Sequence, residues 1–204
     1  MRASAIGIDL SGSERAPTGV ACLDESLVVE SAVVRRDADI LEWVSARVPQ
    51  VVAIDAPLAL PTGRCCAARA CPCARFGIVR EVDRLLARRG HHPFWTLLPS
   101  MVNLTLRGMA LRAIFEGRGL CVVECFPGAV QDILGLPRKQ RGLGGLRRGL
   151  GLLGLRLRQD ATHDELDAAT AAYCGLLYLR GRAEVIVDGG VKFVLPRPGC
   201  FRSP

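Results

Sequence analysis

The first third of the chain carries short apolar runs whose lengths are typical of strands. Residues 4–10 are apolar apart from Asp9, and the runs 18–23 and 26–34 lie on either side of an acidic turn. Short apolar runs bounded by turn-forming residues predict strands joined by tight connections. We therefore expect a three-stranded antiparallel meander at the start of the chain.

Two later apolar runs, at 51–55 and 120–124, are continuous and contain few polar residues. Such runs are typical of strands that a parallel sheet buries on both faces. Apolar residues at helical spacing, together with Pro127 at a favourable first-turn position, predict helices over 38–48, 76–89, 101–117 and 163–180, and one beginning at 127. Residues 56–75 combine prolines with four cysteines, and we expect them to be irregular.

The last third is less regular. Residues 138–158 are dominated by arginine, leucine and glycine, and each glycine weakens a helix by about 1 kcal/mol, so we expect a basic, irregular segment there. A Gly-Gly turn at 189–190 separates short strands at 184–187 and 191–195.

This order of elements predicts an α/β fold. We expect a mixed five-stranded sheet, with three antiparallel strands followed by parallel strands, flanked by helices. A length of 204 residues suits one domain, here spanning 1–204 with a cysteine-containing helical insertion at about 58–118.

The composition indicates an anionic partner and a cytoplasmic location. The net charge of +7 favours an anionic partner such as nucleic acid, although almost all the basic residues are arginine, which also fits a GC-rich coding sequence. No segment approaches the ~20 uninterrupted apolar residues of a membrane span. Nine cysteines cannot all pair within one chain, and no signal-peptide pattern opens the sequence. We expect a cytoplasmic protein with reduced thiols and no membrane partner.

Acidic residues occupy the ends of the predicted strands and the start of the last long helix. Asp9 lies near the end of the first strand, while Asp55 and Glu124 end the two buried strands. Asp164 and Asp167 are three residues apart on the helix, so both can face one way. Buried carboxylates are costly unless they are paired or bind a metal, and oxygen ligands suit Mg²⁺ or Mn²⁺. If these elements meet at one edge of the sheet, they predict a two-metal phosphoryl-transfer site.

Each acidic residue also has a purely structural interpretation. An aspartate directly after a strand, as at Asp9 and Asp55, is often a turn former or a helix N-cap. Glu124 and Asp164 can simply complement the positive end of a helix dipole. The metal-site hypothesis therefore depends on these residues being neighbours in the folded chain.

Several segments, taken in order, resemble domain-of-unknown-function family 429, which consists of predicted nucleases of ribonuclease-H-like fold. They are 7–13 (GIDLSGS), 54–61 (IDAPLALP), 123–129 (VECFPGA) and 163–169 (HDELDAA), with 80–86 (REVDRLL) and 99–101 (PSM) resembling its middle region. The resemblance covers most of the chain and implies the ribonuclease-H-like fold.

The His-Asp-x-x-Asp-Ala pattern at 163–168 is also similar to that of RuvC-type Holliday-junction resolvases, in which helix-borne aspartates complete a metal site begun on the first strand. This resemblance implies that His163 positions a water or a phosphate, with helix capping as the alternative. The candidate ligands of Mg²⁺ or Mn²⁺ are Asp9, Asp55, Asp164 and Asp167, and Glu124 and His163 are further candidate catalytic residues.

Four cysteines lie within nine residues, at Cys65, Cys66, Cys71 and Cys73. Thiolates suit Zn²⁺ or an iron–sulfur cluster, but the spacing departs from the usual paired Cys-x₂₋₄-Cys motifs. A cysteine-rich loop without an ion is the alternative interpretation.

The leading functional hypothesis is a metal-dependent nuclease whose partner is DNA or RNA, with the arginine-rich residues 138–148 contacting phosphates. One alternative is a nucleotide-binding or phosphotransfer protein of the actin and sugar-kinase type, since residues 7–13 also resemble the first phosphate loop of that superfamily. Another is a non-catalytic nucleic-acid-binding module on the same fold.

Overall fold

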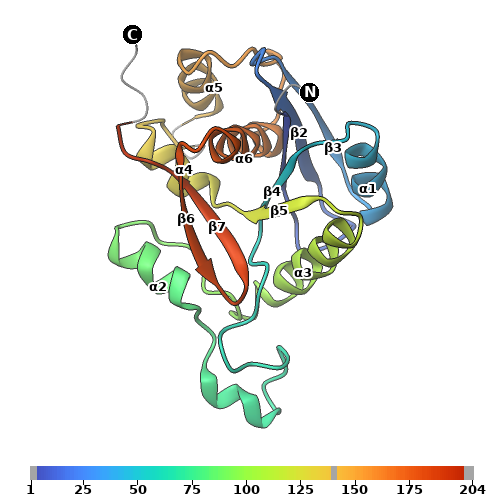
Figure 1. Ribbon diagram of the computed structural model, residues 1–204, viewed down its shortest axis with the longest axis vertical. Coiled ribbons are helices and arrows are strands. Elements are labelled where there is room, and N and C mark those ends of the chain that lie inside the picture. Colours follow the sequence, from blue (N-terminus) through green and yellow to red (C-terminus); the bar gives the residue numbers. More distant parts are fainter. Residues whose placement is uncertain (1–3, 139–141, 200–204) are drawn as a thin grey trace.

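The computed structural model describes residues 4–138 and 142–199 and is built around one mixed sheet of seven strands (Figure 1). Its strands are β1 (Ser4–Asp9), β2 (Thr18–Asp24), β3 (Val29–Val34), β4 (Val51–Asp55), β5 (Cys121–Glu124), β6 (Ala183–Asp188) and β7 (Val191–Pro196). The helices are α1 (Asp37–Ser45), the short 3₁₀ helix η1 (Pro72–Phe76), α2 (Glu81–Arg88), α3 (Val102–Gly117), α4 (Pro127–Ile133), α5 (Leu143–Leu152) and α6 (His163–Leu179).

The strand order is β3-β2-β1-β4-β5-β7-β6. The first three strands form the predicted antiparallel meander, β1 pairs in parallel with β4, and β4 pairs in parallel with β5. The sheet has seven strands and not the five expected, because β7 joins the edge of β5 in parallel and brings its hairpin partner β6 with it. The α/β class and the mixed sheet are confirmed.

Alternate residues along the strands face two different helical layers. Ala5, Val51 and Val123 belong to a core shared with α4, α5 and α6. Ile6 and Val52, one position along, belong to a second core with α1 and α3. The sheet is therefore covered on both faces, as the continuous apolar strands predict. Successive side chains along a strand point to opposite faces, so odd and even positions contact different helical layers.

Two glycines allow α6 to pack unusually close to the sheet. A Cβ atom on Gly7 of β1 would lie 2.0 Å from the carbonyl oxygen of Ala168 and 2.3 Å from the amide nitrogen of Ala172. A Cβ atom on Gly19 of β2 would lie 2.1 Å from the carbonyl oxygen of Asp164. The obstructing atoms belong to the helix backbone, so any side chain at these positions pushes the whole helix outward.

Replacing Gly7 with alanine should therefore destabilise the fold by up to about 3 kcal/mol, the upper range for overpacking a core. Chemical denaturation measures this loss. Gly117→Ala in α3 is the matched control, because its added Cβ meets no atom within 4 Å. Equal stability of the two variants would contradict the close packing of α6 on β1.

The glycine-rich segment departs from the sequence-based expectation. Residues 143–152 form helix α5, where we expected irregular structure, and its buried Leu146 and Leu150 pack in the core shared with α6. Tertiary burial of leucine thus outweighs the weak helix propensity of the glycines. Residues 139–141 of the same stretch lie outside the described residues.

The connection between β4 and α3 projects from the body of the molecule (Figure 1). It contains η1 and α2, and the expected helix over 76–89 begins only at Glu81, after Gly77 adopts a positive φ of 81°. Helix α2 contacts the β6–β7 hairpin, where the backbone N–H of Val82 donates to Asp188 and Arg89 pairs with Glu184. Among the described helices, none is long and apolar enough to cross a membrane.

Candidate functional site

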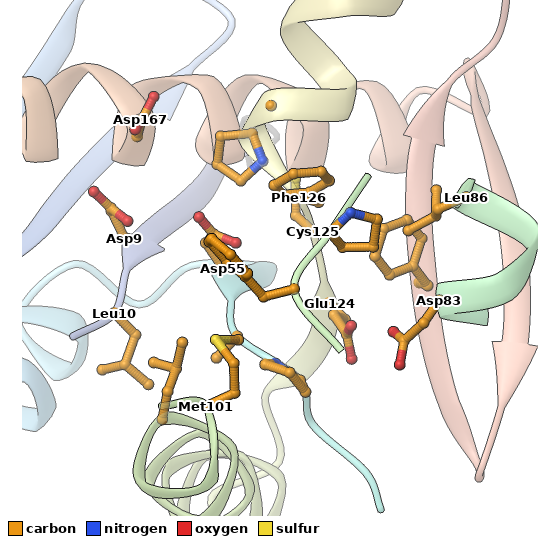
Figure 2. Close-up of a pocket in the computed structure, with 18 of the residues that line it drawn as sticks. Asp9, Leu10, Asp55, Asp83, Leu86, Met101, Glu124, Cys125, Phe126 and Asp167 are labelled. Carbon is orange, nitrogen blue, oxygen red and sulfur yellow. The ribbon is translucent and has the colours of Figure 1, made fainter. Parts of the chain in front are cut away.

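A pocket of about 440 Å³ lies where β1, β4 and β5 end, between α6 and the projecting connection (Figure 2). Its walls include four of the six predicted site residues, namely Asp9, Asp55, Glu124 and Asp167. The carboxyl ends of parallel strands are the usual place for ligands in α/β sheets. The pocket thus has the location that the sequence predicts for a site.

Strand register places Asp9 and Asp55 side by side on the α6 face of the sheet. The two residues are partners in the parallel pairing of β1 with β4, so their side chains leave the sheet on the same face. That face is the one against α6, because Gly7, two residues before Asp9, contacts α6 directly. Figure 2 shows both carboxylates at the same end of the pocket as Asp167.

The start of α6 is fixed by a complete capping box. Thr162 is the N-cap, its hydroxyl accepting from the backbone N–H of Glu165, whose carboxylate accepts from the N–H of Thr162 in return. Glu165 is buried and also receives hydrogen bonds from Ser31 and Arg158. Thr162 therefore caps the helix, and His163 is the first helical residue and not the cap.

The first turn of α6 meets the end of β1. Ligand atoms of Asp9, His163 and Asp164 all lie within 4.8 Å of one another. The His163 Nδ1 atom is 2.9 Å from an Asp164 carboxylate oxygen, and the histidine side chain is 53% exposed. The packing of Asp164 against Gly19, the β2 partner of Asp9, explains this proximity.

Asp167 lies about one turn further along α6 and is buried. One of its oxygens accepts a 2.7 Å hydrogen bond from the side-chain amide of Gln131 on α4, which also reaches the Thr170 hydroxyl at 3.4 Å. Gln131 fixes the orientation of this carboxylate and was not among the predicted site residues. A glutamine on an otherwise buried helix face is the sequence signal that could have identified it.

Glu124 is held away from this group by its position on β5. It is the register partner of Ile54, so its side chain leaves the opposite face of the sheet from Asp55. There its two oxygens accept from both terminal nitrogens of Arg80, at 2.6 and 2.7 Å, and one also accepts from the backbone N–H of Leu58. Figure 2 shows Glu124 beside Asp83, at the other end of the pocket from Asp9.

Arg80 is the centre of this second, fully buried network. Besides Glu124 it contacts Asp83 at 2.9 Å and the Thr96 hydroxyl at 2.7 Å, and Thr96 donates in turn to Asp83. Burial alone would lower the pKa of Arg80, but the Glu124 and Asp83 carboxylates raise it above its ordinary value. The guanidinium therefore stays charged, and Glu124 has a structural role here.

Cys125 is a buried thiol that lines the pocket between its two ends. Its pKa is raised well above the ordinary value, first by a hydrogen bond with Cys174 and by burial, and further by the negative charges of Asp55 and Glu124. The thiol therefore stays protonated.

A comparison with solved structures finds a similar fold. The structure of Thermus thermophilus RuvC in complex with a Holliday junction substrate superimposes with a TM-score of 0.53 and 14% sequence identity, covering 96% of this chain and 99% of that one. A second Thermus thermophilus RuvC structure gives a TM-score of 0.46 and 16% identity over 87% of this chain and 96% of that one. No protein-family model matches the sequence, and no curated protein matches it significantly.

The chain has the ribonuclease-H-like fold. The fold expected from the sequence is thereby confirmed. At this level of identity the likeness concerns the fold alone.

The loop that follows β1 in this ribonuclease-H-like chain is filled by its own hydrogen bonds. The Ser11 hydroxyl contacts the carbonyl oxygens of Ser13 and Ala16 and the hydroxyl of Thr18. Arg107 of α3, itself buried, donates to the Ser11 carbonyl at 2.8 Å and to Asp37 at 2.7 Å. The Ser11 hydroxyl and backbone N–H are thus both engaged within the protein.

Basic and aromatic side chains are among those that line the pocket. They include Arg138, His92 and Phe94, the last of which is 72% exposed. Arg138 pairs with Asp132 and lies 6.0 Å from the ring of Phe126. Of the described part of the arginine-rich stretch 138–148, only Arg138 reaches the pocket.

The four clustered cysteines are also brought together, but at a separate place on the projecting connection. Their sulfur atoms all lie within 4.8 Å of one another. The other described cysteines, Cys22, Cys121, Cys125 and Cys174, are free thiols in strands and in the core.

Proposed function

We propose that this protein is a metal-dependent nuclease that hydrolyses phosphodiester bonds of nucleic acid. The observation that carries the proposal is the position of Asp9 at the strand ends of a ribonuclease-H-like fold, where it is within 4.8 Å of ligand atoms of His163 and Asp164 and lines one pocket with its register partner Asp55 and with Asp167. The structural likeness to RuvC bound to a Holliday junction supports the same interpretation. The resemblance to domain-of-unknown-function family 429 is consistent with it and remains part of the proposal.

The donor set suits a hard divalent cation. Carboxylate oxygens are the ligands that Mg²⁺ and Mn²⁺ prefer. We assign Asp9, Asp55, Asp164 and Asp167 as the residues that would hold the ions. When bound, such ions supply a water nucleophile and stabilise the charge that develops on the phosphate oxygens.

The protein groups have separable tasks around this centre. Gln131 keeps the Asp167 carboxylate oriented, and the capping box keeps Asp164 and His163 in the first turn of α6. The exposed ring of His163 can donate a hydrogen bond to a phosphate oxygen at the edge of the site. Glu124 supports the pocket wall through Arg80 and takes no part in holding the ions.

The pocket lining offers binding groups that fit nucleic acid. Arg138 and His92 can contact phosphates, which supply most of the affinity in such complexes. The exposed Phe94 presents an aromatic face on which a base can stack. The engagement of the Ser11 hydroxyl and N–H by Thr18 offers no support for the actin and sugar-kinase alternative.

The test is cleavage of labelled substrates in the presence of Mg²⁺, Mn²⁺ or Ca²⁺. A four-way DNA junction, duplex DNA, single-stranded DNA and an RNA–DNA hybrid are compared, with an ATP-hydrolysis assay in parallel. We expect cleavage of at least one nucleic acid with Mg²⁺ or Mn²⁺, and little with Ca²⁺, whose looser coordination holds the reacting groups less tightly. ATP turnover without cleavage would instead support the phosphotransfer alternative, and binding without any turnover the non-catalytic module.

A further inference from the structure

The segment 62–77 of the projecting connection lacks an apolar core of its own. Cys73 is the only buried residue in this segment, all of which the structure describes. The five-residue helix η1 is its one regular element. Segments that bury so little apolar surface usually need a disulfide or a metal ion to hold one conformation.

The sulfur atoms of its four cysteines have the spacing of a tetrahedral metal site. Cys65 Sγ is 3.7 Å from Cys71 Sγ, and Cys66 Sγ is 3.8 Å from Cys73 Sγ. A regular tetrahedron with zinc–sulfur bonds of about 2.3 Å has edges of about 3.8 Å. The separations are too long for disulfides, whose sulfur atoms are about 2.05 Å apart.

Four sulfur donors restrict the site to ions that bind thiolates, of which zinc and iron are the common ones. Four sulfur ligands with no nitrogen, oxygen or open position match a closed structural zinc site. An iron–sulfur cluster holds its cysteines around several iron atoms and so keeps them further apart than thiolates that share one ion. The separations, none above 4.8 Å, fit a single ion.

The surrounding charges complement four thiolates around a divalent ion, which carry a net negative charge. Residues 56–80 contain no aspartate or glutamate, and the segment that holds the cysteines carries Arg64, Arg69 and Arg75. Arg64 donates to the carbonyl oxygens of Cys66 and Ala68, which holds its guanidinium beside the cysteine segment. The positive side chains offset the charge of the complex.

We propose that Cys65, Cys66, Cys71 and Cys73 bind one zinc ion that holds segment 62–77 in a single conformation. This site is separate from the carboxylate site, and it does not depend on the proposed nuclease activity. Its role is structural, because all four coordination positions are filled by protein.

The first test is metal content. Protein purified under reducing conditions and dialysed against metal-free buffer should contain one zinc per chain by elemental analysis. The double variant Cys71→Ser/Cys73→Ser should contain less than about a tenth of that amount. Cys22→Ser, which alters a half-buried thiol in β2 outside the cluster, should keep its zinc. Asp9→Asn should keep it too, whatever happens to nuclease activity.

Two further measurements do not depend on a variant that folds. Wild-type protein refolded with Co²⁺ should show the intense visible bands of tetrahedral cobalt thiolate. Trypsin should cleave after Arg69 and Arg75 on the order of ten times faster once the zinc is removed by a chelator, because local unfolding exposes the segment. Absence of bound metal, stoichiometric iron in place of zinc, two disulfides by mass spectrometry, or unchanged proteolysis after chelation would each overturn the proposal.

Discussion

Asp9→Asn should lower the rate of nucleic-acid cleavage by on the order of 10²- to 10³-fold, as loss of one principal electrostatic group in other active sites does. Asp9 lies at the centre of the candidate site, adjacent in register to Asp55 and within 4.8 Å of ligand atoms of His163 and Asp164. Asparagine keeps the shape of the side chain but removes its charge. Single-turnover cleavage of the best substrate, measured at saturating Mg²⁺, quantifies the loss.

The same substitution should leave the fold intact. Removing one charge from a group of neighbouring acids relieves repulsion in the metal-free protein, so its Tm should stay unchanged or rise. Asp160→Asn is the matched control, because this aspartate precedes α6 with an 80% exposed side chain and should retain full activity. Full activity of Asp9→Asn would remove the carboxylate site from consideration.

Glu124→Gln should have the opposite profile, with a large loss of stability. The substitution removes the charge of one of the two carboxylates that bind the buried Arg80 guanidinium and leaves one of its hydrogen bonds unmade, while Asp83 still pairs with it. Losing a buried hydrogen bond to a charged group costs about 1.5–3 kcal/mol, which for a chain of this length corresponds to a fall in Tm of about 5–10 °C. Thermal and chemical denaturation of the metal-free protein measure the change.

Glu184→Gln provides the comparison for an exposed pair. Glu184 also binds an arginine through two hydrogen bonds, but both partners are more than a third exposed. Its loss should cost under about 1 kcal/mol. A Glu124→Gln protein with normal stability and no nuclease activity would contradict the structural role and return Glu124 to the group of metal ligands.

The meander, the parallel strands and the long last helix could all be predicted because their apolar periodicity is local. The pairing of Asp9 with Asp55 followed from the strand order, since both residues end neighbouring strands. The role of Glu124 could not be predicted in the same way. The face of the sheet from which the Glu124 side chain projects depends on the pairing of Glu124 with Ile54, and only the folded sheet fixes that register.

The ion pair of Arg80 with Glu124 could not be predicted from the sequence either, for a related reason. Its side chain comes from the projecting connection and reaches a strand that is 44 residues away in sequence. Helix α5 was missed because glycine content suggested weak helix formation, whereas burial of its leucines against the core decides the outcome. In both cases long-range packing overrides the local pattern.

The Arg80–Glu124 pair limits how the projecting connection can be exchanged with that of a related protein. One partner is carried by the connection and the other by β5, so the two parts are not independent modules. A chimaera that keeps Glu124 but receives a connection without an arginine at the position of Arg80 leaves a carboxylate buried alone. Domain grafting on this scaffold therefore requires the exchange of both residues together, or a well-packed apolar pair in their place.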